Sequence, residues 1–223
     1  MRALLFVACA SFVGLTYAAP AAQVDIDVER ALAAARVRAA AGDVIAQFSL
    51  GSLLYYGADD TPQAIDWFRK AAARKYAPAE FQVGQLYDFG FGGVPQDDAE
   101  ALAWYRKAAD HGSAAGQRAV GDFYRKGRGV AVDATEAARW YRLGANRDDV
   151  RAQYELGQMY FNGTGVTRNY RSAYVWFSLA ALQAPLADNR AGLLELRNIA
   201  AARMTPEDVA TAARLVAAWK PAR

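Results

Sequence analysis

The chain has 223 residues, of which 54% are hydrophobic and 22% are charged, and its formal net charge is +3. This composition is typical of folded soluble proteins and argues against intrinsic disorder. It also argues against a nucleic-acid partner, because the only basic cluster, Arg125, Lys126 and Arg128, is not accompanied by an aromatic RNA motif or a recognition helix.

Residues 1–18 have the pattern of a secretory signal peptide. Arg2 forms a minimal positive region, residues 3–15 are almost entirely apolar, and small residues precede a cleavage site after Ala18. We therefore expect an exported protein, periplasmic or secreted. The alternative is that the apolar run is kept as a short membrane anchor, although it is at the lower limit of spanning length. Cleavage would also remove Cys9, the only cysteine, and no later stretch is apolar enough to cross a bilayer.

Residues 24–41 are predicted to form an N-terminal capping helix that ends at Gly42. Its apolar positions are three or four residues apart: Val24, Val28, Leu32, Ala35 and Ala39. Such a helix would close the end of the repeated segment that follows.

A repeated pattern fills residues 42–184. Four tryptophans, Trp67, Trp104, Trp140 and Trp176, are 37, 36 and 36 residues apart. A fixed period of this length indicates a solenoid, in which copies of one helical unit stack on each other. The predicted repeats are residues 42–76, 77–112, 113–148 and 149–184.

The first helix of each repeat is built around a glycine, with large apolar residues one before it and two and three after it. These glycines are Gly51, Gly84, Gly121 and Gly157. A glycine inside a helix costs about 1 kcal/mol relative to alanine, so we expect a helix of the next repeat to approach too closely for a Cβ atom. A second glycine six residues later is expected to end the helix in the left-handed conformation: Gly57, Gly90, Gly127 and Gly163.

The second helix of each repeat is predicted to begin at a capping side chain seven residues before the tryptophan. The four caps are Asp60, Asp97, Asp133 and Asn169. An alanine lies three residues before each tryptophan and a pair of small residues follows it, which predicts that the indole packs in the core. An aromatic residue follows each tryptophan directly: Phe68, Tyr105, Tyr141 and Phe177.

Residues 185–223 depart from the repeat and predict C-terminal capping helices. Pro185 interrupts the chain, and Thr205 and Pro206 form a strong helix start as N-cap and first helical residue. An apolar stripe then runs from Val209 to Trp219. These helices would cover the last repeat.

The repeated pattern, Ala-x-x-x-[Leu/Val]-Gly-x-x-Tyr-x-x-Gly-x-Gly-Val followed by Asp-x-x-x-Ala-x-x-Trp, resembles Sel1-like repeats, which are related to tetratricopeptide repeats. The resemblance is to the bacterial exported type without cysteines. It implies an all-α fold, an α/α solenoid in which antiparallel helix pairs form a right-handed superhelix. It also implies a role in holding proteins together. The cysteine-rich secreted branch, associated with β-lactam binding, is excluded because the repeats contain no cysteine. Leu54 departs from the pattern where Tyr is usual.

The sequence offers no clear catalytic, metal or cofactor site. The only histidine, His111, is expected to end a second helix rather than act as a general base. The adjacent carboxylates, such as Asp97 and Asp98 or Asp148 and Asp149, stand at expected helix starts, where capping explains them. We therefore predict no enzyme activity, no metal and no cofactor. A carboxylate-based hydrolase on a solenoid remains the less favoured alternative.

Recognition is expected at positions of the first helices that vary between repeats, namely two before, one after and five after the first glycine. By analogy with related arrays these would line the concave side. They are Ser49, Ser52, Tyr56, Gln82, Gln85, Phe89, Asp122, Lys126, Glu155, Gln158 and Asn162, with Ala119 at the remaining position. The predicted function is a non-enzymatic exported adaptor that binds a protein or peptide through this face. The alternative is a structural subunit of an envelope complex. Partner identity and oligomeric state stay open.

Overall fold

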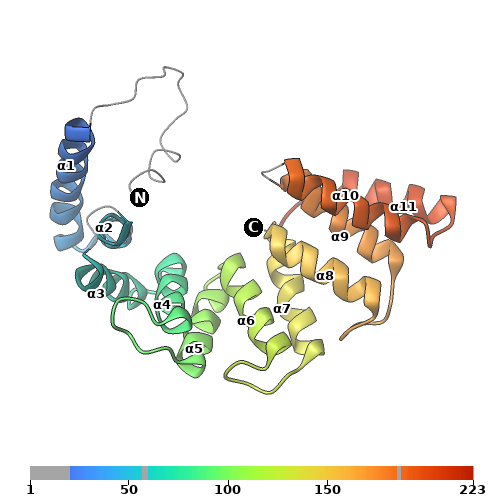
Figure 1. The fold of residues 1–223 in the computed structure, drawn as a ribbon, viewed down its shortest axis with the longest axis horizontal. Coiled ribbons are helices and arrows are strands. Elements are labelled where there is room, and N and C mark those ends of the chain that lie inside the picture. The colour runs from blue at the N-terminus through green and yellow to red at the C-terminus, as the bar shows by residue number, and fades with distance from the viewer. Residues whose placement is uncertain (1–20, 57–59, 185–186, 223) are drawn as a thin grey trace. The chain divides into compact units, whose positions relative to one another are not determined.

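The computed structural model describes residues 21–56, 60–184 and 187–222, which form eleven helices and no strand (Figure 1). The expected signal peptide, its cleavage site after Ala18, and Gly57 lie outside the described residues. The chain divides into two compact units, unit 1 up to Gln96 and unit 2 from Asp97 onward. None of the described helices combines the length and the apolar character needed to cross a membrane.

Unit 1 contains four helices, each packed on the one before it. They are α1 (Ala21–Ala40), α2 (Val44–Tyr56), α3 (Thr61–Ala72) and α4 (Ala77–Phe89). In α1, Ala39 of the predicted stripe is buried, and Gly42 follows the helix with a φ of 87°. A left-handed residue at this place ends the helix, as expected.

Unit 2 contains the other seven helices of the described chain. They are α5 (Asp98–Asp110), α6 (Ala114–Lys126), α7 (Ala134–Asn146), α8 (Val150–Asn162), α9 (Tyr170–Gln183), α10 (Ala187–Ala201) and α11 (Pro206–Ala217). From α5 to α9 each helix packs on the next, and α10 and α11 both pack on α9. The predicted all-α solenoid of stacked helix pairs is confirmed.

The helix ends follow the sequence closely. Asp60, Asp97, Asp133 and Asn169 are N-cap residues whose side chains accept hydrogen bonds from backbone N–H groups one turn into the helix. Gly90, Gly127 and Gly163 end α4, α6 and α8 with φ angles of 67°, 70° and 76°. Both predictions are confirmed for these residues. Caps and left-handed glycines could be predicted because they provide partners for unpaired backbone groups at the helix ends, which depend only on nearby residues.

The partner predicted for the first glycine of a repeat was wrong at Gly51, Gly121 and Gly157. A Cβ atom built on Gly121 would lie 2.8 Å from the ring of Tyr141, and one on Gly157 would lie 2.7 Å from the ring of Phe177. These rings belong to the second helix of the same repeat, not to the next repeat. The aromatic residue that follows each tryptophan is buried, and Phe68, Tyr141 and Phe177 contact the first helix of their own repeat. The glycine therefore makes room for an aromatic ring within the pair.

Contacts between successive repeats of unit 2 use different residues. A Cβ on Gly116 of α6 would lie 2.9 Å from the backbone nitrogen of Ala109, in the preceding α5. Arg106 of α5 donates to the hydroxyl of Tyr124 in α6 at 2.7 Å, and Arg142 of α7 donates to that of Tyr160 in α8 at 2.6 Å.

Leu54 stands in the first repeat where the other three repeats have tyrosine. It is buried in the core of unit 1.

The sequence predicts that all four repeat tryptophans lie in the core, but only two of them are buried. Trp140 and Trp176 are 9% exposed. Trp67 and Trp104 are half-buried, and the ammonium groups of Lys70 and Lys107 lie 4.0 and 3.7 Å from their ring centroids. Stacking on a lysine accounts for an indole that reaches the surface.

The C-terminal segment covers the last repeat, although Trp219 lies beyond the end of α11 rather than within it. Its indole packs on Trp176 with a centroid distance of 5.2 Å, and its Nε1 donates to Asp148 Oδ1 at 3.2 Å. The same oxygen accepts from Gln183 at 2.8 Å. Asp148 therefore ties the C-terminal segment to α9, a role that goes beyond the predicted cap.

Candidate functional site

The residues predicted to bind a partner fall into two groups because they lie in separate units. In unit 1, Ser49, Tyr56 and Phe89 are exposed, whereas Ser52, Gln82 and Gln85 are half-buried. In unit 2, Lys126 and Asn162 are exposed, whereas Asp122, Glu155 and Gln158 are half-buried. The remaining position of the series, Ala119, is buried. We call the side of α6 and α8 that carries these residues the first-helix face of unit 2.

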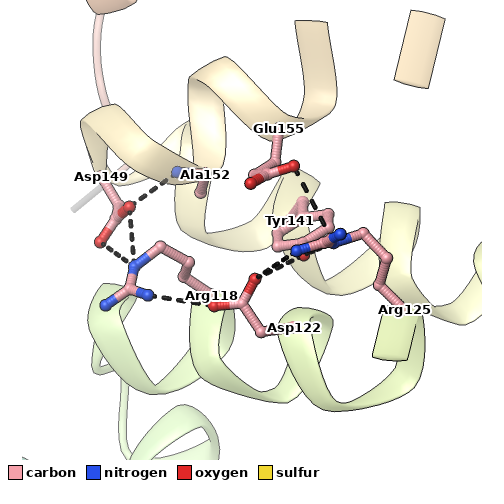
Figure 2. A network of polar contacts seen from close by, with 7 residues as sticks. All are labelled: Arg118, Asp122, Arg125, Tyr141, Asp149, Ala152 and Glu155. Atoms are coloured by element: carbon pink, nitrogen blue, oxygen red, sulfur yellow. Dashed lines mark hydrogen bonds and ion pairs between the residues drawn. The ribbon is translucent and has the colours of Figure 1, made fainter. Parts of the chain in front are cut away.

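A polar network joins the first-helix face to α7 beneath it, as Figure 2 shows. The hydroxyl of Tyr141 donates to Asp122 Oδ1 at 2.7 Å and accepts from Arg125 Nε at 3.0 Å. Arg118 donates to the other oxygen of Asp122 at 3.2 Å. Tyr141 is fully buried, so its hydroxyl depends on these partners for its hydrogen bonds.

Two ion pairs extend the network from α6 to α8 (Figure 2). Arg118 Nε lies 3.3 Å from Asp149 Oδ1, and that aspartate also caps α8 by accepting from Ala152 N at 2.8 Å. Arg125 Nε lies 3.9 Å from Glu155 Oε2. The network thus fixes the spacing of the two helices that form the face.

The electrostatics of the network keep its central groups in one protonation state. Burial, followed by the charge of Asp122 and the hydrogen bond to it, raises the pKa of Tyr141 strongly above its usual value. Burial lowers the pKa of Arg125, but the hydrogen bond to Tyr141 and the nearby carboxylates outweigh it and leave the pKa raised. Both groups stay protonated near neutral pH, so neither is suited to act as a general base there.

The sequence prediction included Asp122 and Glu155 but missed Arg118, Arg125, Tyr141 and Asp149. A signal for Arg118 was present, because the residues three before the first glycine are Phe48, Phe81, Arg118 and Tyr154. A charged residue at a position that is aromatic in the other three repeats indicates that the surface of the third repeat differs from theirs. The pairing with Asp149 depends on the spacing of α6 and α8, which the sequence pattern does not contain.

A groove between α8 and α10 begins next to Asp149. Its volume is about 420 Å³, and its lining includes Val150, Arg151, Tyr154, Asn189, Leu193 and Leu196. Gly192 also lines it, and a Cβ atom built there meets nothing within 4 Å. Gln158 reaches the groove by donating to the Tyr154 hydroxyl at 3.0 Å. We call this feature the α8–α10 groove.

The other candidates for chemistry have structural partners. His111 is the C-cap residue of α5, Asp97 caps the start of the same helix, and Asp98 pairs with Arg128. In the described part of the chain, no group of three or more His, Cys, Asp or Glu side chains is placed to hold a metal ion.

Comparison with known proteins identifies the repeats. The Sel1 repeat family model matches residues 44–76, 77–113, 114–149 and 150–185. The chain belongs to the Sel1 repeat family. Sel1 repeats typically form protein-interaction scaffolds. No curated protein matches the chain.

The solved structures that resemble this Sel1 repeat chain include two bacterial proteins. A Sel1 repeat protein from Oxalobacter formigenes is 30% identical, with a TM-score of 0.67, and the match covers 79% of this chain and 80% of that one. The protein c5321, a protective antigen present in uropathogenic Escherichia coli strains, is 29% identical with a TM-score of 0.52. That match covers 80% of this chain but 45% of the antigen, so this chain spans less than half of its length.

Proposed function

We propose that this chain is a non-enzymatic exported adaptor that binds a protein or an extended peptide through the first-helix faces of its repeats. In unit 2, the α8–α10 groove would take an apolar side chain of the partner. The observation that carries this proposal is the groove itself, a space of about 420 Å³ that is bordered by Leu193, Leu196 and the ring of Tyr154. Pockets of this size with a few polar groups at the edge are typical of binding sites.

The first-helix face next to the groove supports the same interpretation. Lys126 and Asn162 are exposed there, and Gln158 is half-buried and bonded to Tyr154. These side chains can form hydrogen bonds with the backbone of an extended partner. The network from Arg118 to Glu155 fixes α6 and α8 before binding, which reduces the ordering cost of association.

The structure offers a sharp test at Gly192. Because a Cβ there meets nothing within 4 Å, Gly192→Trp should fill the groove without disturbing α10, and Gly192→Ala is the matched control. Proteins captured from the envelope fraction of the source by wild type and by Gly192→Ala, but lost with Gly192→Trp, would support the proposal. Equal capture by all three, with unchanged circular dichroism, would refute binding in the groove.

Export rests on the pattern of residues 1–18. The similar E. coli protein is described as a protective antigen, which fits a protein that leaves the cytoplasm. Expression with a C-terminal tag, fractionation and N-terminal sequencing test this part separately. A mature chain that starts at Ala19 supports it, and a cytoplasmic chain that retains Met1 contradicts it.

A further inference from the structure

A second cavity lies at the C-terminal end of unit 2, and none of its lining residues lines the α8–α10 groove. Because α10 and α11 both pack on α9, a space of about 310 Å³ opens between the three helices. Tyr174, Ser178 and Ala181 of α9 line it, together with Leu194 of α10 and Val216 of α11. We call it the α9–α11 pocket.

Two arginines of α10, Arg190 and Arg197, line one side of this pocket. They are seven residues apart, which places them on one face of the helix and about 10 Å apart along its axis. Arg190 donates to the backbone oxygen of Ala184 at 3.5 Å, and Arg197 donates to Asn198 Oδ1 at 2.8 Å. Within the described residues, neither guanidinium has a carboxylate partner.

Arginines of unit 2 differ in the partners that they find. Arg118, Arg128, Arg139 and Arg171 each form an ion pair with an aspartate or a glutamate, whereas Arg106 and Arg142 donate to tyrosine hydroxyls. The pair on α10 places two positive charges beside an apolar cavity. Charge-assisted hydrogen bonds to carboxylates are the strongest contacts that such groups can make.

The size and edge of the pocket favour a segment of a protein over a free small molecule. Its volume is at the lower end of the range for ligand sites and suits one bulky apolar side chain. Leu182 lines the pocket and is 66% exposed, so the apolar surface continues beyond the cavity. An occupant large enough to cover both the cavity and Leu182 must extend past a single side chain.

We propose that the α9–α11 pocket binds an acidic segment of a partner protein, with a bulky apolar side chain in the cavity and carboxylates on Arg190 and Arg197. This site is independent of the α8–α10 groove, since the two are lined by different residues of α10. Each proposal can therefore fail without the other.

The probe is the amidated peptide Glu-Ala-Phe-Ala-Glu, whose glutamates and phenylalanine share one side of an extended chain. Titrated into the isotope-labelled protein, it should shift the NMR signals of residues that line the pocket. Arg190→Gln with Arg197→Gln should weaken binding about tenfold or more, since two charge-assisted contacts are lost. Replacing both peptide glutamates by glutamine should weaken binding to the wild type but have no further effect on this double variant.

Matched controls separate the pocket from general attraction to a basic protein. Arg147→Gln with Lys220→Gln removes the same charge at exposed positions outside the pocket and should leave affinity unchanged. Ala213→Trp, at an exposed position of α11 that lines the cavity, should abolish binding. Three results would overturn the proposal: no shifts in the pocket, equal loss in the control pair, or equal binding of a peptide with alanine in place of phenylalanine.

Discussion

Replacing Gly157 by alanine should destabilise the protein, although alanine is the better helix former. A Cβ atom at this position would lie 2.7, 2.8 and 3.2 Å from three ring carbons of Phe177. Phe177 is fully buried in the core, so its ring cannot move aside into solvent. Real Cβ atoms do not approach other carbons this closely, and α8 or α9 must therefore shift.

Two opposing effects set the magnitude. Alanine gains about 1 kcal/mol over glycine inside a helix. Forcing an extra carbon into a packed core costs about 1–3 kcal/mol, so we expect a net loss of up to about 2 kcal/mol. Gly192→Ala provides the matched control, because it also lies inside a helix but its Cβ meets nothing within 4 Å. That variant should gain about 1 kcal/mol.

Urea unfolding followed by circular dichroism measures both variants in the full chain. Phe177→Leu added to Gly157→Ala should be less harmful than the sum of the single changes, because the smaller side chain leaves room for the new methyl group. If Gly157→Ala were as stable as Gly192→Ala, the close approach would not be the reason for this glycine.

Three further predictions concern the same unit. Trp140→Ala should destabilise by about 3–5 kcal/mol, as expected for a large side chain that is 9% exposed, and an unchanged melting temperature would contradict its place in the core. Asp133→Ala removes the acceptor of two backbone N–H groups at the start of α7 and should cost about 1 kcal/mol in urea unfolding, whereas Asp133→Asn should cost much less. Because the pKa of Tyr141 is raised, the folded protein keeps the hydroxyl proton above about pH 10, where the unfolded chain loses it. The contribution of Tyr141 to the free energy of unfolding is therefore fully present below about pH 10. Above that pH it falls by up to about 1.4 kcal/mol per pH unit. Tyr141→Phe should reduce this loss in urea unfolding at high pH, and identical slopes for the two proteins would refute it.

The parts of the fold that depend on nearby residues were predictable from the sequence. The caps Asp97 and Asp133 and the left-handed Gly127 and Gly163 satisfy backbone groups within one turn. The stacked architecture follows from the period of the tryptophans. The contact of Gly157 with Phe177 could not be predicted in the same way. A glycine at the same position of every repeat indicates that another group lies close to it, but not which helix carries that group.

The candidate site was predictable only in part. Comparing equivalent positions of the four repeats separates shared residues from variable ones, but it does not show which side chains contact each other. Asp122 and Glu155 were found as variable positions. In the sequence, Arg125 stands out only as part of a basic cluster, yet it lies 3.7 Å from Asp122 and 3.9 Å from Glu155 and so links the two. The α8–α10 groove was missed altogether, since α10 lies outside the repeated pattern.

The polar network on the first-helix face can be explained by the buried hydroxyl of Tyr141. In the first and fourth repeats, the ring beneath the first helix belongs to phenylalanine, and aromatic residues cover it: Phe48 lies 5.6 Å from Phe68, and Tyr154 lies 6.4 Å from Phe177. The third repeat has Tyr141 there, and a buried hydroxyl needs partners. Asp122 accepts a hydrogen bond from it, and that half-buried carboxylate in turn accounts for the arginines around it.

This origin bears on where a partner can bind. A ligand that competed for Arg125 would leave the Tyr141 hydroxyl and Asp122 with fewer partners in a partly buried place, which costs more than an exposed contact returns. The network therefore resists displacement and acts as a rigid support. The energy of recognition on this face should come instead from the α8–α10 groove, whose apolar lining and open space at Gly192 require no existing bond to break.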